Sequence, residues 1–138
     1  MVRFFLEDIV YKVVSPVKTK KWVKDIAESE GYVLGDLNYI FCSDEYLLEM
    51  NRTHLSHDYY TDIITFDNSE AEEELEGDIF ISIDRVRDNA DAQSVAVDEE
   101  LRRVLAHGVL HLCGYDDHSD GDRVLMREKE NYYLSKFN

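Results

Sequence analysis

The sequence lacks most of what disordered or membrane-spanning chains contain. Its 138 residues include one proline and six glycines, too few for a disordered or low-complexity chain. No run of about 18 apolar residues is present, so we expect no transmembrane helix. The opening residues become acidic at Glu7 and Asp8, which is too early for a secretory signal peptide. We therefore expect a cytoplasmic protein that is not attached to a membrane.

Cysteine and positive charge are also scarce. The two cysteines, Cys42 and Cys113, lie far apart in the sequence, and we interpret both as small buried hydrophobic residues in a reducing compartment. The 15 Lys and Arg residues face 30 Asp and Glu residues, which gives a formal net charge of −15. This charge counts against a nucleic-acid partner, because phosphate contacts need a basic surface. A polyanion would have to find a local positive field, from a metal ion or from a pair such as Arg102 and Arg103.

Apolar residues are numerous enough to predict one folded domain over residues 1–138, since they make up 44% of the chain. Their spacing predicts strands over residues 2–6, 37–42, 62–66 and 77–83, and helices that begin near Thr19, Ser43 or Asp44, Asp84, Asp98 and Asp120. The last of these strands is apolar enough to be buried on both faces, or nearly so. In the last helix the expected packing residues are Val124, Leu125, Tyr132 and Leu134. These elements predict an α+β domain, a central sheet with helices packed on it.

The most informative segment extends from Ala106 to His118 and contains three of the five histidines. His107 and His111 are four residues apart, so on a helix their side chains lie on one face. Gly114 can end that helix in a left-handed conformation, after which the chain turns back toward the same face. Two imidazoles and a third ligand leave one coordination position open, which is typical of a catalytic zinc ion. We therefore predict one zinc ion per chain, in a cleft beside this helix.

Two residues compete for the position of the third ligand. In the metzincin pattern H-E-x-x-H-x-x-G-x-x-H the third ligand follows the second histidine by six residues, and Asp117 occupies that position here. His118 would need a one-residue adjustment of the loop, so Asp117 is favoured, and a carboxylate is an acceptable zinc ligand. Metallopeptidases carry a general-base Glu directly after the first histidine, where this chain has Gly108, and a peptidase is therefore disfavoured.

The same segment resembles a known family. Residues 107–116 read HGVLHLCGYD, which resembles the motif H-G-x-L-H-L-x-G-Y-D of the YbeY family of bacterial metal-dependent endoribonucleases. Residues 61–66, TDIITF, are similar to the family's T-D-V-L-S-F, and residues 77–82, GDIFIS, are similar to its G-D-I-x-I-S. Met126 falls where the family has a methionine after the metal loop. In this order the motifs extend over residues 46–130, most of the chain.

The resemblance implies both a fold and an activity. The fold would be a sheet of four strands, largely parallel with one antiparallel strand, surrounded by helices and containing a zinc cleft. The activity would be cleavage of single-stranded RNA, in processing the 3′ end of small-subunit (16S) ribosomal RNA and in ribosome quality control. The expected partners are therefore single-stranded or ribosomal RNA and the ribosome or ribosome-assembly proteins.

Two positions depart from the family pattern. The third ligand is normally a histidine, where this chain has Asp117, and a functional family arginine is matched by Leu55. The candidates to replace that arginine or to contact phosphate are Arg52, His54, His57 and Arg103. The acidity of the chain and Leu55 favour an alternative function, a ribosome-associated assembly factor with a mainly structural zinc and little hydrolase activity. The open three-ligand site favours the nuclease.

Overall fold

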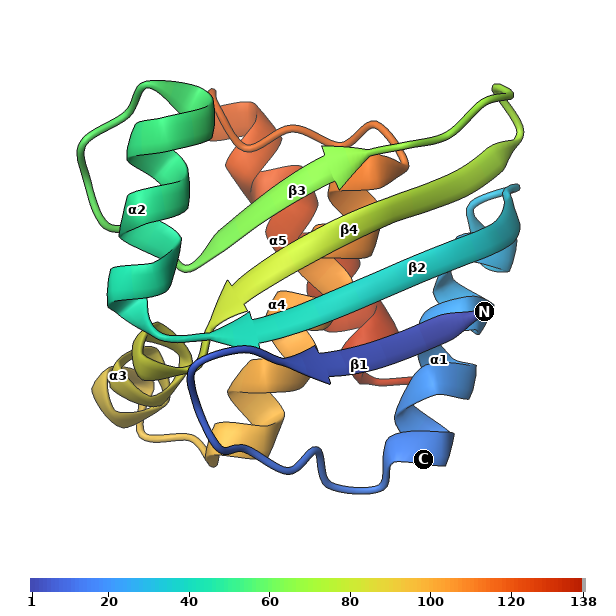
Figure 1. Ribbon diagram of the computed structural model, residues 1–138. Coiled ribbons are helices and arrows are strands. Elements are labelled where there is room, and N and C mark those ends of the chain that lie inside the picture. Colours follow the sequence, from blue (N-terminus) through green and yellow to red (C-terminus); the bar gives the residue numbers. More distant parts are fainter. Residues whose placement is uncertain (138) are drawn as a thin grey trace.

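The computed structural model describes residues 1–137, so the last residue of the predicted domain, Asn138, lies outside the described part (Figure 1). The elements in chain order are β1 Val2–Leu6, α1 Pro16–Ser29, β2 Val33–Cys42, α2 Asp44–Leu55, β3 Ile63–Asp67, β4 Glu74–Ser82, α3 Ile83–Gln93, α4 Val97–Leu112 and α5 Asp120–Leu134. The sheet has the order β1-β2-β4-β3, in which β1, β2 and β4 are parallel and β3 is antiparallel to β4. The predicted α+β class and mixed four-stranded sheet are confirmed. None of the helices in residues 1–137 has the length and apolar character needed to cross a membrane.

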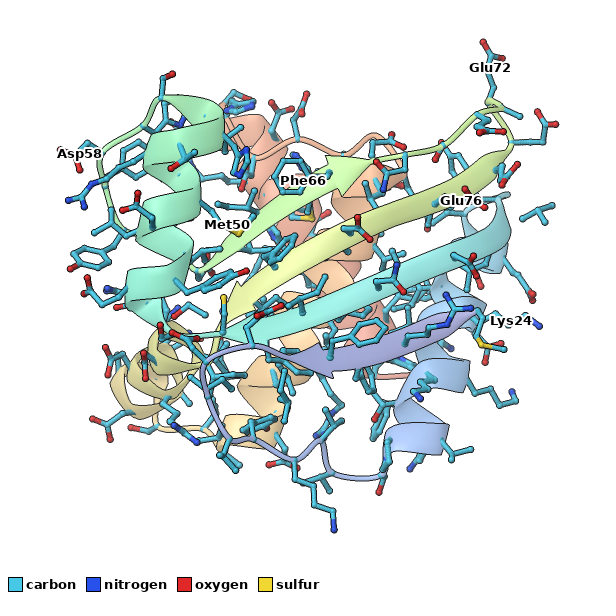
Figure 2. All side chains as sticks on the ribbon, in the orientation of Figure 1. Lys24, Met50, Asp58, Phe66, Glu72 and Glu76 are labelled. Atoms are coloured by element: carbon cyan, nitrogen blue, oxygen red, sulfur yellow. The ribbon has the colours of Figure 1, made fainter. Side chains whose placement is uncertain are left out.

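The sheet separates two hydrophobic clusters of unequal size. The larger cluster lies between the sheet and the helices α1, α4 and α5, which are seen behind the strands in Figure 1. The smaller cluster lies on the opposite face, where Met50 of α2 and Phe66 of β3, labelled in Figure 2, pack against it. Along β4 every second residue is fully buried and the residues between them are only partly buried. The predicted burial of this strand is therefore complete on one face and partial on the other.

Helix α4, which carries the histidine pair, lies directly on the sheet. A β-carbon at Gly108 would be 3.0 Å from Ile79 and 3.1 Å from Ile63, so only glycine allows this close approach without displacing its neighbours. The hydroxyl of Tyr39 on β2 donates to the backbone carbonyl of Leu105 on α4 at 2.9 Å. These contacts fix the height and rotation of α4 above the strands.

Two helix starts differ from the predicted positions. α1 begins at Pro16, because proline presets the backbone of the first helical turn, and Thr19 lies inside the helix with its hydroxyl donating to the Ser15 carbonyl at 2.8 Å. α4 begins after Ala96, and the predicted cap Asp98 lies in its first turn. There Asp98 accepts a hydrogen bond from Arg102 at 3.2 Å and interacts favourably with the positive end of the helix dipole.

The predicted packing face of α5 is wrong. Val124, Leu125 and Tyr132 are 59%, 45% and 53% exposed, and of the expected residues only Leu134 packs partly against the core. The buried residues of this helix are Met126, Glu130 and Tyr133, which share another face. The physical reason is that a buried carboxylate, Glu130, finds partners on α4, so the inward face includes a charged residue that hydrophobic patterning assigns to solvent.

Candidate metal centre

A pocket of about 380 Å³ opens between the C-terminal half of α4, the start of β3 and the loop that follows α4. We call it the histidine pocket, and it is lined by Tyr59, Thr61, Asp62, Ile63, Thr65, His107, His111, Asp117 and His118. All four predicted ligand candidates therefore line one pocket, although they come from both the helix and the loop.

The loop returns to the helix through a glycine turn, as the sequence predicted. Gly114 has a φ of +103°, which is the left-handed region that favours glycine. Its backbone N–H donates to the carbonyl of His111 at 3.0 Å, and the N–H of Tyr115 donates to the carbonyl of Leu110 at 3.1 Å. These bonds close the last turn of α4 and direct residues 116–118 back along it.

Each of the two imidazoles is held by a hydrogen bond at its own Nδ1 atom. The rings of His107 and His111 are nearly parallel, with an angle of 6° between planes and 6.3 Å between centroids. Nδ1 of His107 lies 2.8 Å from Oε2 of Glu130, and Nδ1 of His111 lies 3.0 Å from the backbone carbonyl of Tyr115. When Nδ1–H donates to such an acceptor, Nε2 keeps its lone pair and can bind a metal ion.

Asp117 approaches the first of these nitrogens. Its Oδ2 lies 3.3 Å from Nε2 of His107, close to the separation of about 3.4 Å expected between two donors on one tetrahedral zinc ion. His118 also lines the pocket, but its side chain is exposed to solvent. The geometry therefore brings Asp117 and His107 together, while His118 lines the same pocket as an exposed residue.

The donor set is incomplete as it stands. In the part of the chain that the structure describes, no three His, Cys, Asp or Glu side chains converge closely enough to hold a metal ion. The donor types nevertheless fit zinc, because two imidazole nitrogens and one carboxylate oxygen are among its preferred ligands. Completing the set requires movement of side chains within the pocket.

Glu130 supports His107 from the core and was not identified from the sequence. Its side chain is 6% exposed and also accepts a hydrogen bond from Arg103 at 3.0 Å. Burial lowers the pKa of His107, but the hydrogen bond and charge of Glu130, together with the charges of Asp117 and Asp62, outweigh it and raise that pKa. The available signal was the spacing of Glu130 four residues after Met126, which places both on one face of a helix.

Asp62 is a second carboxylate in the pocket that sequence reasoning assigned only to a strand. It directly precedes β3, and its backbone carbonyl accepts a hydrogen bond from the N–H of Ser82 at 3.0 Å. Burial raises the pKa of its carboxyl group, the charge of His107 opposes this, and the charge of Asp117 adds to it. The pocket therefore contains a carboxylate that approaches from the sheet, opposite the helix.

The candidate arginines do not line the histidine pocket. Arg52 donates from Nε to Asp58 at 2.5 Å, and the label in Figure 2 places Asp58 on the outer loop beside α2. Arg103 donates to Glu130 at 3.0 Å and to Asn131 at 2.8 Å, so its guanidinium is engaged on α5.

The other candidates lie in the segment around the end of α2. His54 lines a separate hollow on the outer side of α2. Leu55 and His57 line a pocket of about 250 Å³ that shares Tyr59, Thr61, Ile63, Thr65 and His111 with the histidine pocket. We call this neighbouring space the side pocket. Of the candidates, His57 adjoins the histidine pocket, and so does Leu55, which stands where the family has an arginine.

The loop after α4 is also held from its outer side, by Glu30 at the end of α1. Glu30 accepts hydrogen bonds from the hydroxyls of Tyr115, at 2.7 Å, and Tyr133, and from Lys129 at 3.2 Å. Burial raises the pKa of the Glu30 carboxyl, but the hydrogen bonds from Tyr133, Tyr115 and Lys129 outweigh it and lower that pKa. Tyr115 is thus fixed through its side chain while its carbonyl holds His111.

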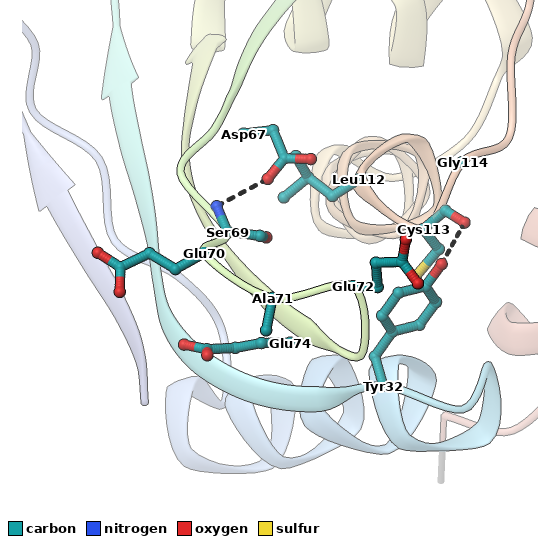
Figure 3. A pocket seen from close by; sticks show the side chains of 10 residues that line it. All are labelled: Tyr32, Asp67, Ser69, Glu70, Ala71, Glu72, Glu74, Leu112, Cys113 and Gly114. Atoms are coloured by element: carbon teal, nitrogen blue, oxygen red, sulfur yellow. Dashed lines mark hydrogen bonds between the residues drawn. The ribbon is translucent and has the colours of Figure 1, made fainter.

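A larger pocket, of about 510 Å³, lies on the other side of the end of α4 (Figure 3). We call it the acidic pocket, and it is lined by Tyr32, Asp67, Ser69, Glu70, Ala71, Glu72, Glu74, Leu112, Cys113 and Gly114. The Tyr32 hydroxyl donates to the carbonyl of Cys113 at 3.0 Å. Its lining contains four carboxylates and no imidazole.

The fold and the histidine pocket define a small α+β domain with the donor types of a metal-dependent hydrolase. The family described as Endoribonuclease YbeY matches residues 6–138 of the sequence. The chain belongs to this YbeY family.

Individual relatives cover nearly the whole chain. The sequence is 58% identical over 132 residues to Endoribonuclease YbeY of Cytophaga hutchinsonii, across 96% of this chain and 92% of that protein. It is 47% identical over 134 residues to Endoribonuclease YbeY of Parabacteroides distasonis, across 97% of this chain and 94% of that protein. The solution structure of TM1509 from Thermotoga maritima is similar, with a TM-score of 0.69 and 27% identity over 99% of this chain and 89% of that one.

Proposed function

We propose that this chain is a zinc-dependent endoribonuclease that cleaves single-stranded RNA in maturation of the 3′ end of small-subunit ribosomal RNA and in ribosome quality control. The observation that carries the proposal is the pair of imidazoles on α4, each held through Nδ1, beside Asp117 in one open pocket. The names of the relatives, Endoribonuclease YbeY, support the reaction class. The proposal treats residues 1–138 as one hydrolase domain that acts in the cytoplasm with the ribosome or its assembly proteins.

Three side chains would hold the zinc ion: His107, His111 and, as third ligand, Asp117 in preference to His118. Asp117 is preferred because its carboxylate oxygen already lies 3.3 Å from Nε2 of His107. When bound there, zinc would acidify a water molecule or polarise a phosphoryl oxygen so that the ribose 2′-hydroxyl can attack. Both routes use the same three ligands.

The surrounding residues would orient the ligands and move a proton. Glu130 and the Tyr115 carbonyl keep the two Nδ1–H groups engaged, so both Nε2 atoms remain free to bind the ion. Asp62 would accept the proton of the attacking group at its carboxylate, since it lines the same pocket and Gly108 cannot take that role.

The test is cleavage of a single-stranded fragment of small-subunit ribosomal RNA by the purified protein, with and without added zinc. We expect cleavage of unpaired RNA only in the metal-loaded protein, and loss of cleavage in His111→Ala. A matched control is His54→Ala, because His54 lies outside the pocket on α2. Cleavage that persists after metal removal, or its absence from metal-loaded protein, would contradict the proposal.

A second measurement separates the nuclease from the assembly factor with a structural zinc. If zinc is catalytic, His107→Ala remains folded by circular dichroism but no longer processes RNA. If zinc is structural, the same substitution unfolds the domain. The large core, built mostly from residues outside the pocket, favours the first result.

A further inference from the structure

Two aromatic side chains stand stacked in solvent beside the histidine pocket. The rings of His57 and Tyr59 are 5.2 Å apart between centroids, with an angle of 21° between their planes. The Tyr59 hydroxyl lies 3.0 Å from Nδ1 of His57, and Tyr59 is 56% exposed. An exposed, preformed stack of this kind leaves outer ring faces available to another planar group.

The backbone that carries this pair is fixed by hydrogen bonds to Asn51 of α2. Asn51 is 1% exposed, and its side-chain amide donates to the carbonyl of Tyr59 at 2.9 Å. The backbone N–H of His57 donates to the carbonyl of the same Asn51 at 3.0 Å. Asn51 therefore anchors both ends of the segment 57–59 by hydrogen bonds, and the two rings are carried by a backbone that is fixed in place.

The stack adjoins the candidate metal centre. Tyr59 lines both the histidine pocket and the side pocket, and His57 lines the side pocket. Both pockets also share Thr61, Thr65 and His111. A strand with its reacting phosphate at the histidines can therefore place a neighbouring nucleotide against these rings.

The positively charged side chains near the histidine pocket and the side pocket are already engaged and do not offer a free binding site for phosphate. Arg52 is paired with Asp58, and Arg85 is paired with Asp44 at 2.6 Å. Arg123, which donates to backbone carbonyls of the loop after α4, is paired with Asp120, so these three guanidinium groups already have carboxylate partners. The chain as a whole carries a formal charge of −15. Base stacking on aromatic rings contributes about 1–3 kcal/mol per base and does not depend on neutralising phosphate.

We propose that the stacked rings of His57 and Tyr59 form a subsite for one unpaired nucleobase next to the phosphodiester at the histidine pocket. The inference rests on the proposed function and deepens it, because it states how the substrate is held. A base inside a duplex has both faces covered by its neighbours, so such a subsite selects single-stranded RNA. The subsite is tolerant of sequence, since every base has a π-face.

The test is fluorescence anisotropy with metal-loaded protein and a fluorescein-labelled single-stranded oligoribonucleotide whose 2′-hydroxyls are methylated. Methylation blocks attack by the 2′-hydroxyl, and gel electrophoresis after each measurement checks that attack by water has left the probe intact. Tyr59→Ala should weaken binding by about 5- to 150-fold, and Tyr59→Phe should bind nearly as the unmodified protein does. Tyr60→Ala is the matched control, because Tyr60 is 48% exposed but donates to Glu45 and does not line either pocket. Its affinity should be unchanged.

Two further probes show whether the lost contact is with a base. In a series of oligonucleotides with one abasic position each, the Tyr59→Ala penalty should disappear for one position and persist for the others. The penalty should also remain constant between about 50 and 200 mM salt, because stacking releases no counterions. Equal losses in Tyr60→Ala and Tyr59→Ala, or a penalty present on every abasic probe, would overturn the subsite.

Failure of the subsite and failure of the proposed function give different results. If unmodified protein cleaves RNA and Tyr59→Ala has the same KM and affinity, the subsite is refuted and the nuclease stands. If unmodified protein binds the probe with dependence on Tyr59 but cleaves no RNA, the subsite stands and the nuclease is refuted. Thermal unfolding of Tyr59→Ala and Tyr60→Ala should match that of the unmodified protein, which excludes a folding defect as the cause.

Discussion

The histidine pocket and the acidic pocket both adjoin the end of α4. The acidic pocket is the larger of the two, but it lacks the imidazole ligands that a zinc site needs. The acidic pocket has a volume of about 510 Å³ and is lined by four carboxylates, two hydroxyls and the thiol of Cys113 but by no imidazole, whereas the histidine pocket has about 380 Å³ and combines imidazoles with carboxylates. Carboxylates without a cation between them repel one another and any phosphate group. The comparison teaches that fixed nitrogen donors, and not pocket size, identify the site.

The surroundings of the two pockets also differ: carboxylates border the acidic pocket, and aromatic rings adjoin the histidine pocket. Glu70, Glu72 and Glu74 border the acidic pocket, and Figure 2 shows Glu72 projecting from the turn between β3 and β4. On the other side of the histidines lie the rings of His57 and Tyr59. An RNA strand bound at the histidine pocket, as proposed, would therefore be repelled from the acidic pocket.

The largest expected difference between the two pockets is the effect of removing a carboxylate on RNA cleavage and zinc binding, with Asp117 as the proposed third zinc ligand. Asp117→Ala should lower RNA cleavage by about a thousandfold or more and weaken zinc binding, because the ion would lose one of three protein ligands. Glu72→Ala, a carboxylate of the acidic pocket, should leave both properties within about twofold. Metal content and initial rates measure the effects. If His118→Ala removes the metal and Asp117→Ala does not, the ligand assignment is wrong.

Asp62→Asn should separate proton transfer from metal binding. The amide keeps the size of the side chain but cannot accept a proton, so we expect kcat to fall by about 100-fold or more. Zinc content should remain one per chain, since Asp62 is not assigned as a ligand. Asp67→Asn is the corresponding change at the other end of β3, in the acidic pocket, and should not alter kcat. An unchanged kcat in Asp62→Asn would remove Asp62 from the mechanism.

Glu130→Gln tests the support behind the histidine pocket. Loss of the carboxylate behind His107 should weaken zinc affinity by about 10- to 100-fold, as measured by competition with a chelator. Glu128→Gln is the matched control on the same helix, where the side chain is exposed. Equal zinc affinities in the two variants would show that Glu130 does not orient the ligand.

Glu30→Gln tests the bond network that holds the loop between the two pockets. We expect a loss of about 1–3 kcal/mol in the free energy of unfolding near neutral pH, because a partly buried, charged hydrogen-bond acceptor is removed. The pKa of Glu30 is lowered in the folded state, so its contribution is present above the pKa of the unfolded chain and is lost as pH falls through the folded pKa. Urea unfolding between about pH 3 and 7 should therefore be less pH-dependent in Glu30→Gln. A parallel pH profile would contradict this.

The smallest effect is expected from neutralising the acidic pocket. Substitution of Glu70, Glu72 and Glu74 by Gln should raise the affinity for single-stranded RNA by about two- to fivefold at low salt. The gain should vanish as salt shortens the Debye length to about 8 Å and below. A decrease in affinity would show that the acidic pocket takes part in binding.

The sequence predicted the fold class, and it predicted that His107, His111 and Asp117 lie close together, because both depend on spacing along the chain. That these three residues bind a metal ion stays a prediction. His107 and His111 lie one turn apart, and the turn at Gly114 returns the chain toward them. The supports of the site were not predictable in this way. Glu130 and Glu30 act through contacts that join residues 23 and 85 positions apart, to His107 and Tyr115 respectively.

The misassigned face of α5 shows the same limit. Hydrophobic patterning placed Val124 and Leu125 inward, whereas the structure turns Met126 and the charged Glu130 toward α4. Arg127 of the same helix lies 3.7 Å from this carboxylate, but its closest partners, Arg103 and His107, belong to α4. Patterning along one helix contains no information about such pairs.

The glycine between the two histidines has a consequence for engineering. A single replacement of Gly108 by glutamate would reproduce the H-E-x-x-H arrangement of peptidases on paper. In this scaffold the new side chain would be driven against Ile79 and Ile63, which a β-carbon at this position already approaches to 3.0 and 3.1 Å. Redesign toward proteolysis would first have to lift the helix off the strands, and so dismantle the packing that aligns the two imidazoles.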